Sequence, residues 1–131
     1  MPCRTTALKE GTATRHKNHS FELQVANWLM QDGWQVFIPL LDDAHATDLL
    51  ISDGPQYFRI QIKTITAQDE SVEVVNRWKG RDIHYVIYFA KTSNWGYVCP
   101  AFKTNIKRLN HADHKRFQQK RDDFLKAFHS L

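Results

Sequence analysis

Five residues of this chain have the types and the spacing that a metal-assisted hydrolysis needs. They are Glu22, Asp48 and the tripeptide Gln61-Ile62-Lys63. Two carboxylates and an amide oxygen are suitable ligands for a hard divalent cation, and a nearby ammonium group can help to activate a water beside a phosphate. The pattern therefore predicts a site for phosphodiester hydrolysis, provided that the fold brings the four polar side chains together.

The first of these side chains lies in a predicted helix from about Arg15 to Asp32, which Gly33 closes. At about 100° per residue, one apolar arc of this helix contains Phe21, Leu23, Val25, Ala26, Trp28, Leu29 and Met30. Glu22 falls inside that arc. Because a buried carboxylate without a partner is costly, a cation, hydrogen bonds or a metal is expected to compensate it. The alternative is a glutamate at the rim of the helix, exposed or paired with an arginine.

Two predicted strands carry the other site residues. Residues 48–52 and 56–65 are rich in β-branched and aromatic residues, and an Asp-Gly-Pro turn separates them, which predicts a hairpin. The strand period of two places Gln61 and Lys63 on one face. Such a polar row is also typical of a solvent-exposed face of an antiparallel hairpin. Pairing of the two strands would bring Asp48 close to this row, which favours the metal site.

The remaining elements are predicted to complete one sheet with helices beside it. Further strand candidates are residues 34–40, 71–75, 84–89 and 96–102, and the nearly continuous apolar run 84–89 is predicted to be central. After Pro100, apolar residues recur at helical spacing and predict an amphipathic helix; they are Phe117, Phe124, Leu125 and Phe128. Because the sequence has no repeat or linker, residues 1–131 are interpreted as one α/β domain, with a central mixed sheet flanked by helices.

Composition and charge limit the classes of function. No apolar run approaches the roughly 20 residues that span a bilayer, and no signal peptide is recognisable, so a cytoplasmic protein without a membrane partner is expected. Cys3 and Cys99 form neither a disulfide framework nor a zinc motif. Residues 103–131 carry eight Lys or Arg against three Asp. This basic end suits a polyanion such as nucleic acid, and it is equally typical of a solvated helix face.

Basic residues elsewhere are candidates for contacts with nucleic acid. Arg77, Trp78, Lys79 and Arg81 mix cations with an aromatic side chain in a polar connection, as a groove or backbone contact does. A surface loop over one buried tryptophan is the alternative. Together with Lys17 in the first helix, Arg77, Lys79 and Arg81 are the predicted DNA-binding residues.

Two histidine pairs offer a competing metal chemistry. His16 and His19 are three residues apart, as are His111 and His114, so each pair is able to share a helix face. Neither pair has a cysteine or a nearby glutamate at the spacing of a zinc motif. Zinc is therefore the less favoured alternative.

The order of the site residues resembles the PD-(D/E)xK nuclease superfamily. Glu22, Asp48 and Gln61-Ile62-Lys63 are similar to its helix, strand, hairpin and strand arrangement, in the variant that has glutamine in place of the second acid. The run from Arg59 to Thr64 resembles the QxKT strand of bacterial members related to a group I intron homing endonuclease, as residues 84–89 and 96–100 resemble their later strands. The resemblance spans roughly residues 11–102 and implies a restriction-endonuclease-like core. Thr47 stands where the eponymous proline is expected.

The resemblance implies a role for each site residue. Asp48 is the principal metal ligand, Gln61 adds its side-chain oxygen and Ile62 its backbone carbonyl, while Glu22 holds the metal directly or through a water. Lys63 orients or helps to deprotonate the attacking water and stabilises charge on the phosphate. The implied metal is Mg²⁺ or Mn²⁺, and the implied function is a metal-dependent DNA endonuclease. Since one site cuts one strand, a homodimer or higher homo-oligomer is expected.

Two alternatives to this function stay open at the level of sequence. A neutral amide binds a cation less strongly than a carboxylate, so Gln61 is also compatible with a DNA-binding module on a nuclease fold that no longer cleaves. Action on RNA is the other alternative, because attack by a metal-bound hydroxide does not itself distinguish the sugars.

Overall fold

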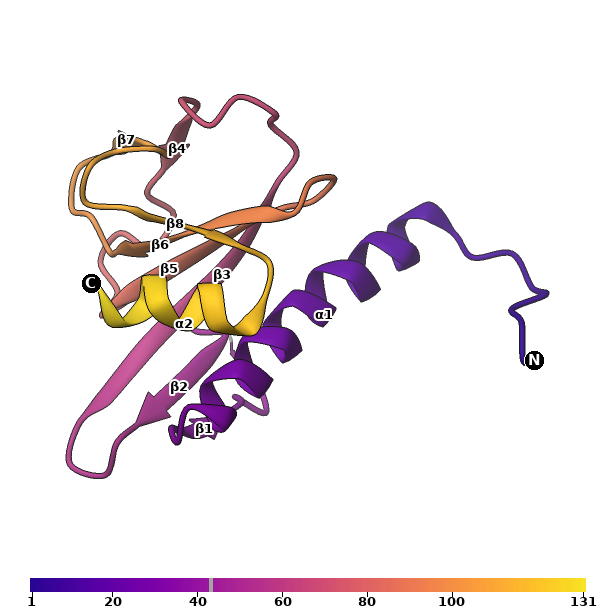
Figure 1. Ribbon diagram of the computed structural model, residues 1–131, viewed down its shortest axis with the longest axis horizontal. Helices are drawn as coiled ribbons and strands as arrows, with labels where there is room; N and C mark the ends of the chain where they lie inside the picture. Colours follow the sequence, from indigo (N-terminus) through magenta and orange to yellow (C-terminus); the bar gives the residue numbers. More distant parts are fainter. Residues whose placement is uncertain (43) are drawn as a thin grey trace.

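A computed structural model of the chain describes residues 1–42 and 44–131. Its main sheet has six strands in the order β1-β2-β3-β5-β6-β8 (Figure 1). Their bounds are β1 (Gln35–Phe37), β2 (Leu49–Ser52), β3 (Tyr57–Ile65), β5 (Tyr85–Ala90), β6 (Trp95–Pro100) and β8 (Lys115–Gln118). Strands β3 and β5 run parallel, whereas the other neighbours in this sheet run antiparallel. The expected α/β class with a central mixed sheet is confirmed.

Both helices of the described chain, α1 (Glu10–Gln31) and α2 (Arg121–His129), pack on the same face of this sheet. The hydrophobic cluster between them and the strands includes Phe21, Val25, Trp28, Leu29, Ile60, Ile62, Ile87, Phe89, Phe117, Phe124 and Phe128. Helix α1 begins five residues earlier than predicted and ends before Gly33, whose φ of +96° is the left-handed conformation expected there. The predicted apolar arc is too wide, because Leu23 and Met30 are exposed.

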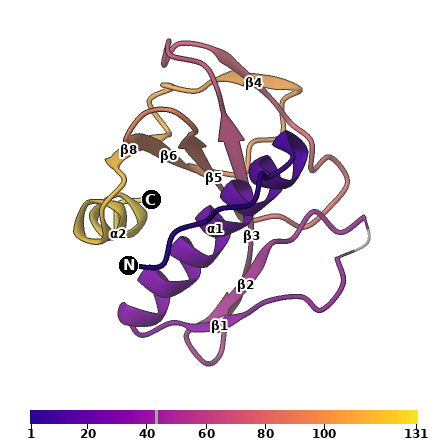
Figure 2. The same ribbon diagram turned by 90° about the vertical axis from the view of Figure 1, so that its right-hand side faces the viewer.

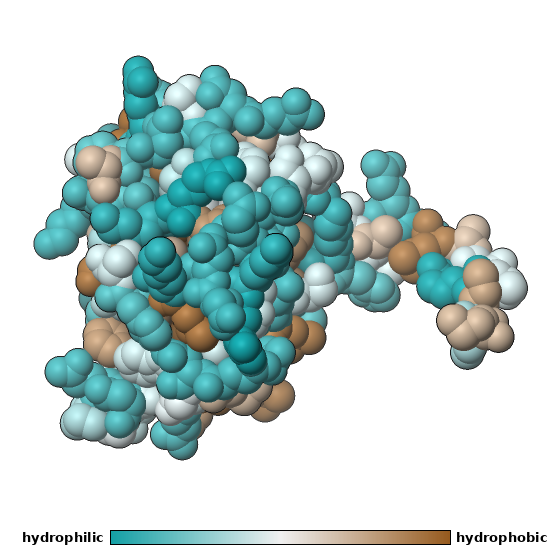
Figure 3. All heavy atoms as spheres, in the orientation of Figure 1, coloured by the Kyte–Doolittle hydropathy of each residue, from teal (hydrophilic) through white to brown (hydrophobic). Residues whose placement is uncertain are grey.

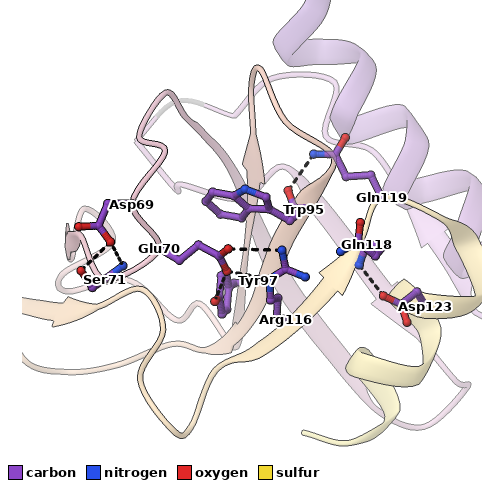
Figure 4. Close-up of polar contacts among 9 residues, drawn as sticks. All are labelled: Asp69, Glu70, Ser71, Trp95, Tyr97, Arg116, Gln118, Gln119 and Asp123. Carbon is purple, nitrogen blue, oxygen red and sulfur yellow. Dashed lines mark hydrogen bonds and ion pairs between the residues drawn. The ribbon is translucent and has the colours of Figure 1, made fainter.

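The opposite face of the main sheet is covered by a two-stranded sheet, β4 (Glu73–Val75) with β7 (Ile106–Arg108), and by loops. A polar network holds the connection after β3 against this face (Figure 4). Glu70 Oε1 accepts hydrogen bonds from the Tyr97 hydroxyl at 2.6 Å and from Arg116 Nε at 2.7 Å. The Arg116 guanidinium holds the pKa of Glu70 below its usual range. The ionised network therefore fixes this connection beside β6 and β8.

The prediction of a helix that includes Phe117 is wrong, because Phe117 lies in β8. It is fully buried, and in the β6–β8 register it stands opposite Gly96. A Cβ at Gly96 would lie 2.5 Å from the Phe117 ring, so the absence of a side chain at Gly96 makes room for the aromatic ring. Helix α2 begins only at Arg121. The apparent helical period from 117 to 128 joins one strand residue to a genuine helix face.

Two other predicted strands are shorter in the structure. Residues 34–40 yield only β1, which ends before Pro39, a residue without the N–H that a ladder needs. Residues 71–75 yield only β4, which pairs with β7. No helix among residues 1–42 and 44–131 is long and apolar enough to cross a membrane.

The N-terminal half of α1 extends beyond the rest of the molecule (Figures 1 and 3). None of residues 1–20 is buried, and the buried positions of α1 begin at Phe21. The helix therefore has two parts, a projecting half and a half that packs on the sheet. Glu22 lies at their junction.

Candidate active site

Asp48 lies where strands β2 and β3 stop pairing. Its backbone N–H donates to the Ile60 carbonyl at 2.9 Å, and its carboxylate Oδ2 accepts the N–H of Ile62 at 2.7 Å. In the antiparallel register Leu49 pairs with Ile60, so Asp48 stands opposite Gln61. The predicted hairpin is confirmed, and its pairing brings the Asp48 carboxylate to the Gln61-Ile62-Lys63 segment.

The electrostatic surroundings of Asp48 show which charged groups lie near it. Burial raises the pKa of Asp48 to about 6, and the neighbouring Glu22 carboxylate adds to the increase through its charge and a hydrogen bond. The N–H of Ile62 and the ammonium of Lys63 act in the opposite direction. Glu22 from α1, Asp48 from the start of β2 and Lys63 from β3 therefore converge. Figure 2 shows α1 crossing in front of β3.

Gln61 provides the observation that tests whether a cation fits. Its side chain is only 6% exposed, and its Oε1 has no hydrogen-bond partner among the described residues. A buried acceptor without a partner costs about 1–3 kcal/mol, so native structures rarely keep one without a reason. An oxygen-liganded cation beside Asp48 would satisfy this oxygen and offset the repulsion between the two carboxylates. The residues present fit a hard divalent cation.

A denser metal cluster is not found. Within residues 1–42 and 44–131, no group of three or more His, Cys, Asp or Glu side chains is placed to hold a metal ion. The candidate site thus has two carboxylates, and its further ligands would have to be neutral oxygens. The zinc alternative gains no support: His114 is buried with Nδ1 2.7 Å from the Leu109 carbonyl, and its ring stacks on Phe102.

Glu22 is neither fully buried nor free. Its side chain is 27% exposed, and its Oε2 lies 2.9 Å from His19 Nδ1. One turn of α1 away, Asn18 Oδ1 accepts a hydrogen bond from the Thr64 hydroxyl at 3.2 Å, which ties α1 to the end of β3. Sequence reasoning missed Asn18 and His19 as neighbours of the site. Their spacing of four and three residues before Glu22 is the signal that places them on its side of the helix.

The loop before Asp48 is held by its own hydrogen bonds. Asp42 Oδ2 accepts the N–H of Thr47 at 2.9 Å, and the Arg59 guanidinium donates to the Thr47 hydroxyl at 3.3 Å. Ala44 and Ala46 adopt φ values of 63° and 57°, which are strained for residues with a Cβ. Thr47 is buried, and these two hydrogen bonds anchor this loop.

The predicted DNA-binding residues lie in two regions. Lys17 is exposed on the projecting half of α1. Arg77, Lys79 and Arg81 are exposed in the connection between β4 and β5, where Trp78 is 3% exposed. The alternative, a surface loop over one buried tryptophan, is therefore confirmed, and contact of these exposed cations with nucleic acid stays a prediction. Arg81 also donates from Nε to the Ala44 carbonyl at 2.5 Å, which links it to the loop before Asp48.

The raised pKa of Asp48 predicts that stability depends on pH and on metal together. Between about pH 4 and pH 6 the folded chain keeps a proton that the unfolded chain has released, so the free energy of unfolding falls as pH rises through this window. A divalent cation binds the ionised form. Mn²⁺ at 100 times its Kd is expected to stabilise the chain by about 2.7 kcal/mol at pH 8, and clearly less at pH 5.

Thermal melts with Mn²⁺ or EDTA at the two pH values measure this effect. Asp48→Asn is the control, because it removes the titrating carboxylate and should abolish most of the Mn²⁺-dependent shift. An equal shift in the variant, or a larger one at pH 5, would contradict metal binding at Asp48.

Comparison with known proteins bears on the fold of the chain. No model of a known protein family matches the chain, and no curated protein matches it. Among solved structures, the chain is similar to a bacterial homing endonuclease, I-Ssp6803I, with a TM-score of 0.54 and 18% sequence identity over 82% of this chain and 76% of the other. At this identity the similarity establishes the fold. The chain has the α/β fold of that homing endonuclease, with a mixed six-stranded sheet and N- and C-terminal helices, as the resemblance to PD-(D/E)xK nucleases implied.

Proposed function

We propose that the chain is a Mg²⁺- or Mn²⁺-dependent DNA endonuclease. The observation that carries the proposal is the position of Asp48, which stands opposite Gln61 with its buried, unpartnered Oε1 and accepts the Ile62 N–H. Glu22 and Lys63 are near enough to Asp48 to alter its pKa. Two acids and an amide oxygen provide the hard ligands, and a lysine provides the cation that phosphate chemistry needs. The fold shared with a homing endonuclease supports the same conclusion.

Each residue of the site would have a distinct task. Asp48, Gln61 Oε1, the Ile62 carbonyl and Glu22 would hold the cation, which when bound polarises the phosphate and a water. The hydrogen bond from the Ile62 N–H to Oδ2 of Asp48 holds this carboxylate in place. The Asp48 side chain would therefore not have to reorient to bind the cation. Lys63 would orient the attacking water and stabilise the negative charge that develops on the phosphate.

DNA would approach across the exposed cations near the loop before Asp48. A hollow of about 800 Å³ is lined by Arg59, Lys79, Arg81 and Lys103, with Asp82 as its acid. Arg81 and Arg59 also bond to the loop before Asp48, so this basic surface adjoins the site. We assign phosphate contacts to Lys79 and Arg81 in this hollow, to Arg77 in the same connection between β4 and β5, and to Lys17 on α1.

Double-strand cleavage would require two copies of the chain, since each contributes one site. Exposed apolar residues lie at the end of the edge strand β1 and directly after it, namely Phe37, Ile38, Leu40 and Leu41. A homodimer would cover this surface and present two sites to opposite strands.

A DNA-binding module that no longer cleaves is the second candidate, and Gln61 in place of an acid favours it. Supercoiled plasmid incubated with the protein, in Mg²⁺, Mn²⁺ or EDTA, separates the two functions. We expect nicked or linear products with either metal and none in EDTA. Plasmid binding with no nicking in either metal, across varied DNA and RNA substrates, would favour the module.

Substitution of Gln61 should separate metal binding from stability. Gln61→Leu removes the buried unpartnered oxygen while keeping a similar volume, so the melting temperature without metal is expected to stay equal or to rise. Cleavage at limiting Mg²⁺ should fall roughly 10- to 100-fold, with recovery at higher Mn²⁺. Gln61→Glu is the matched control, because it introduces a carboxylate and should lower the metal concentration needed for half-maximal cleavage. An unchanged metal requirement in both variants would remove Gln61 from the site.

A further inference from the structure

The side of α1 that carries Glu22 continues outward along the projecting half of the helix. Arg15, Asn18, His19 and Glu22 follow the spacing of three, four and seven residues that places side chains in one row. The inner members of this row belong to the surroundings of the site. Asn18 bonds to Thr64 at the end of β3, and His19 lies within hydrogen-bond distance of Glu22. Arg15 is the next position outward.

The projecting half has no buried side chain that would explain its length. Residues 10–20 are helical although none of them is buried, and an isolated helical segment of this size is marginal in water. The Arg15 guanidinium makes one long hydrogen bond, 3.4 Å to the Thr12 hydroxyl, and no ion pair with any described residue. A free arginine on an exposed helix is available for an external partner.

The charge of this segment identifies the class of partner. Residues 1–20 contain four Lys or Arg, at positions 4, 9, 15 and 17, and one acid, Glu10. A second copy of the chain would bring the same charge to the contact and be repelled, whereas a polyanion is complementary. In space the row begins at the proposed active site, so the polyanion in question is the substrate itself.

We propose that the projecting half of α1 is an arm that binds the sugar-phosphate backbone of duplex DNA, with Arg15 on a phosphate close to the one that is cleaved. The inference rests on the proposed function and adds a contact to it. Arg15 lies two helical turns from Glu22, about 10 Å along the axis, which corresponds to about three base pairs of a duplex. A guanidinium suits this task because it grips phosphate through two parallel hydrogen bonds.

Salt-dependent binding tests the arm. A fluorescent mixed-sequence DNA duplex is titrated with the full chain in EDTA, so that no cleavage occurs, over a series of NaCl concentrations. Arg15→Gln is expected to lower the affinity roughly five- to tenfold and to reduce the slope of log K against log salt by about 0.9, the effect of one lost phosphate contact. Arg15→Lys should keep the slope. Hydrogen exchange should slow across residues 10–20 when DNA is bound.

The control is Lys126→Gln, which removes the same charge from an exposed position of α2, beside the opposite end of α1. It should bind as the unaltered chain does. If Arg15→Gln matched this control in affinity and slope, while the unaltered chain bound and cut DNA, the arm would be refuted and the nuclease would stand. If Arg15→Gln weakened binding but no form cut plasmid, the arm would stand and the nuclease would fall. No binding of the duplex by the unaltered chain at low salt would overturn the arm.

Discussion

Asp48→Asn is expected to reduce Mg²⁺-dependent cleavage of plasmid by about 10³-fold, which corresponds to about 4 kcal/mol of transition-state stabilisation. The amide retains an oxygen that can accept the Ile62 N–H, so the local backbone should keep its geometry. It lacks the negative charge that binds the cation. Because the carboxylate is disfavoured where it lies, with a pKa raised to about 6, the neutral variant should also be more stable at pH 8 without metal, by at most about 3 kcal/mol.

The opposite signs of these two effects make the prediction specific. A variant that lost activity by unfolding would lose stability as well. Asp123→Asn is the matched control, because Asp123 also accepts a backbone N–H, from Gln118, far from the proposed site (Figure 4). It should cleave normally. Cleavage by Asp48→Asn within tenfold of the unaltered chain would remove Asp48 as the principal ligand.

Lys63→Ala is expected to lower the cleavage rate by about 10²- to 10³-fold while DNA binding in EDTA changes little. The ammonium lies near Asp48, where it lowers the pKa of that carboxylate. Its removal would take away the group that orients the water and meets the charge on the phosphate. The rate is to be measured at saturating Mn²⁺, so that weaker metal binding does not account for the loss.

Lys115→Ala is the control for this variant. Lys115 is a partly buried lysine on β8, at the opposite edge of the main sheet from β1. Its loss should leave the cleavage rate unchanged. A Lys63→Ala protein that nicks plasmid as fast as the Lys115→Ala protein would show that Lys63 has no part in the reaction.

The elements that position the candidate site were predictable because polar residues interrupt otherwise apolar patterns there. Strand β3 alternates cleanly, which identified Gln61 and Lys63, and the Asp-Gly-Pro turn fixed the hairpin that sets Asp48 opposite Gln61. Strand β5 was predictable from the nearly continuous apolar run at residues 84–89, which is typical of a strand buried on both faces. Local patterns sufficed because these features depend on strand period and turn chemistry.

Features that depend on tertiary contacts were not predictable in this way. Phe117 reads as part of a helix, but the pairing of β8 with the neighbouring strand β6, in which Phe117 stands opposite Gly96, makes it a strand residue. Helix α1 extends to Glu10 without apolar residues that would indicate a packed face, so periodicity alone gave a later start. The neighbours of Glu22, in contrast, depend on a local spacing that the sequence does contain. His19 is three residues from both His16 and Glu22, and the spacing to Glu22 is the one that corresponds to a contact in the structure.

A crystal soaked in Mn²⁺ tests most directly whether a divalent cation binds among the four converging side chains. Anomalous density is predicted between the carboxylate of Asp48 and Oε1 of Gln61, about 2.1 Å from each, with Glu22 in direct or water-mediated contact. The same soak of Asp48→Asn crystals should show no peak. Anomalous density elsewhere on the molecule, or a candidate site that stays empty at saturating Mn²⁺, would contradict the proposed metal centre and the nuclease activity that depends on it.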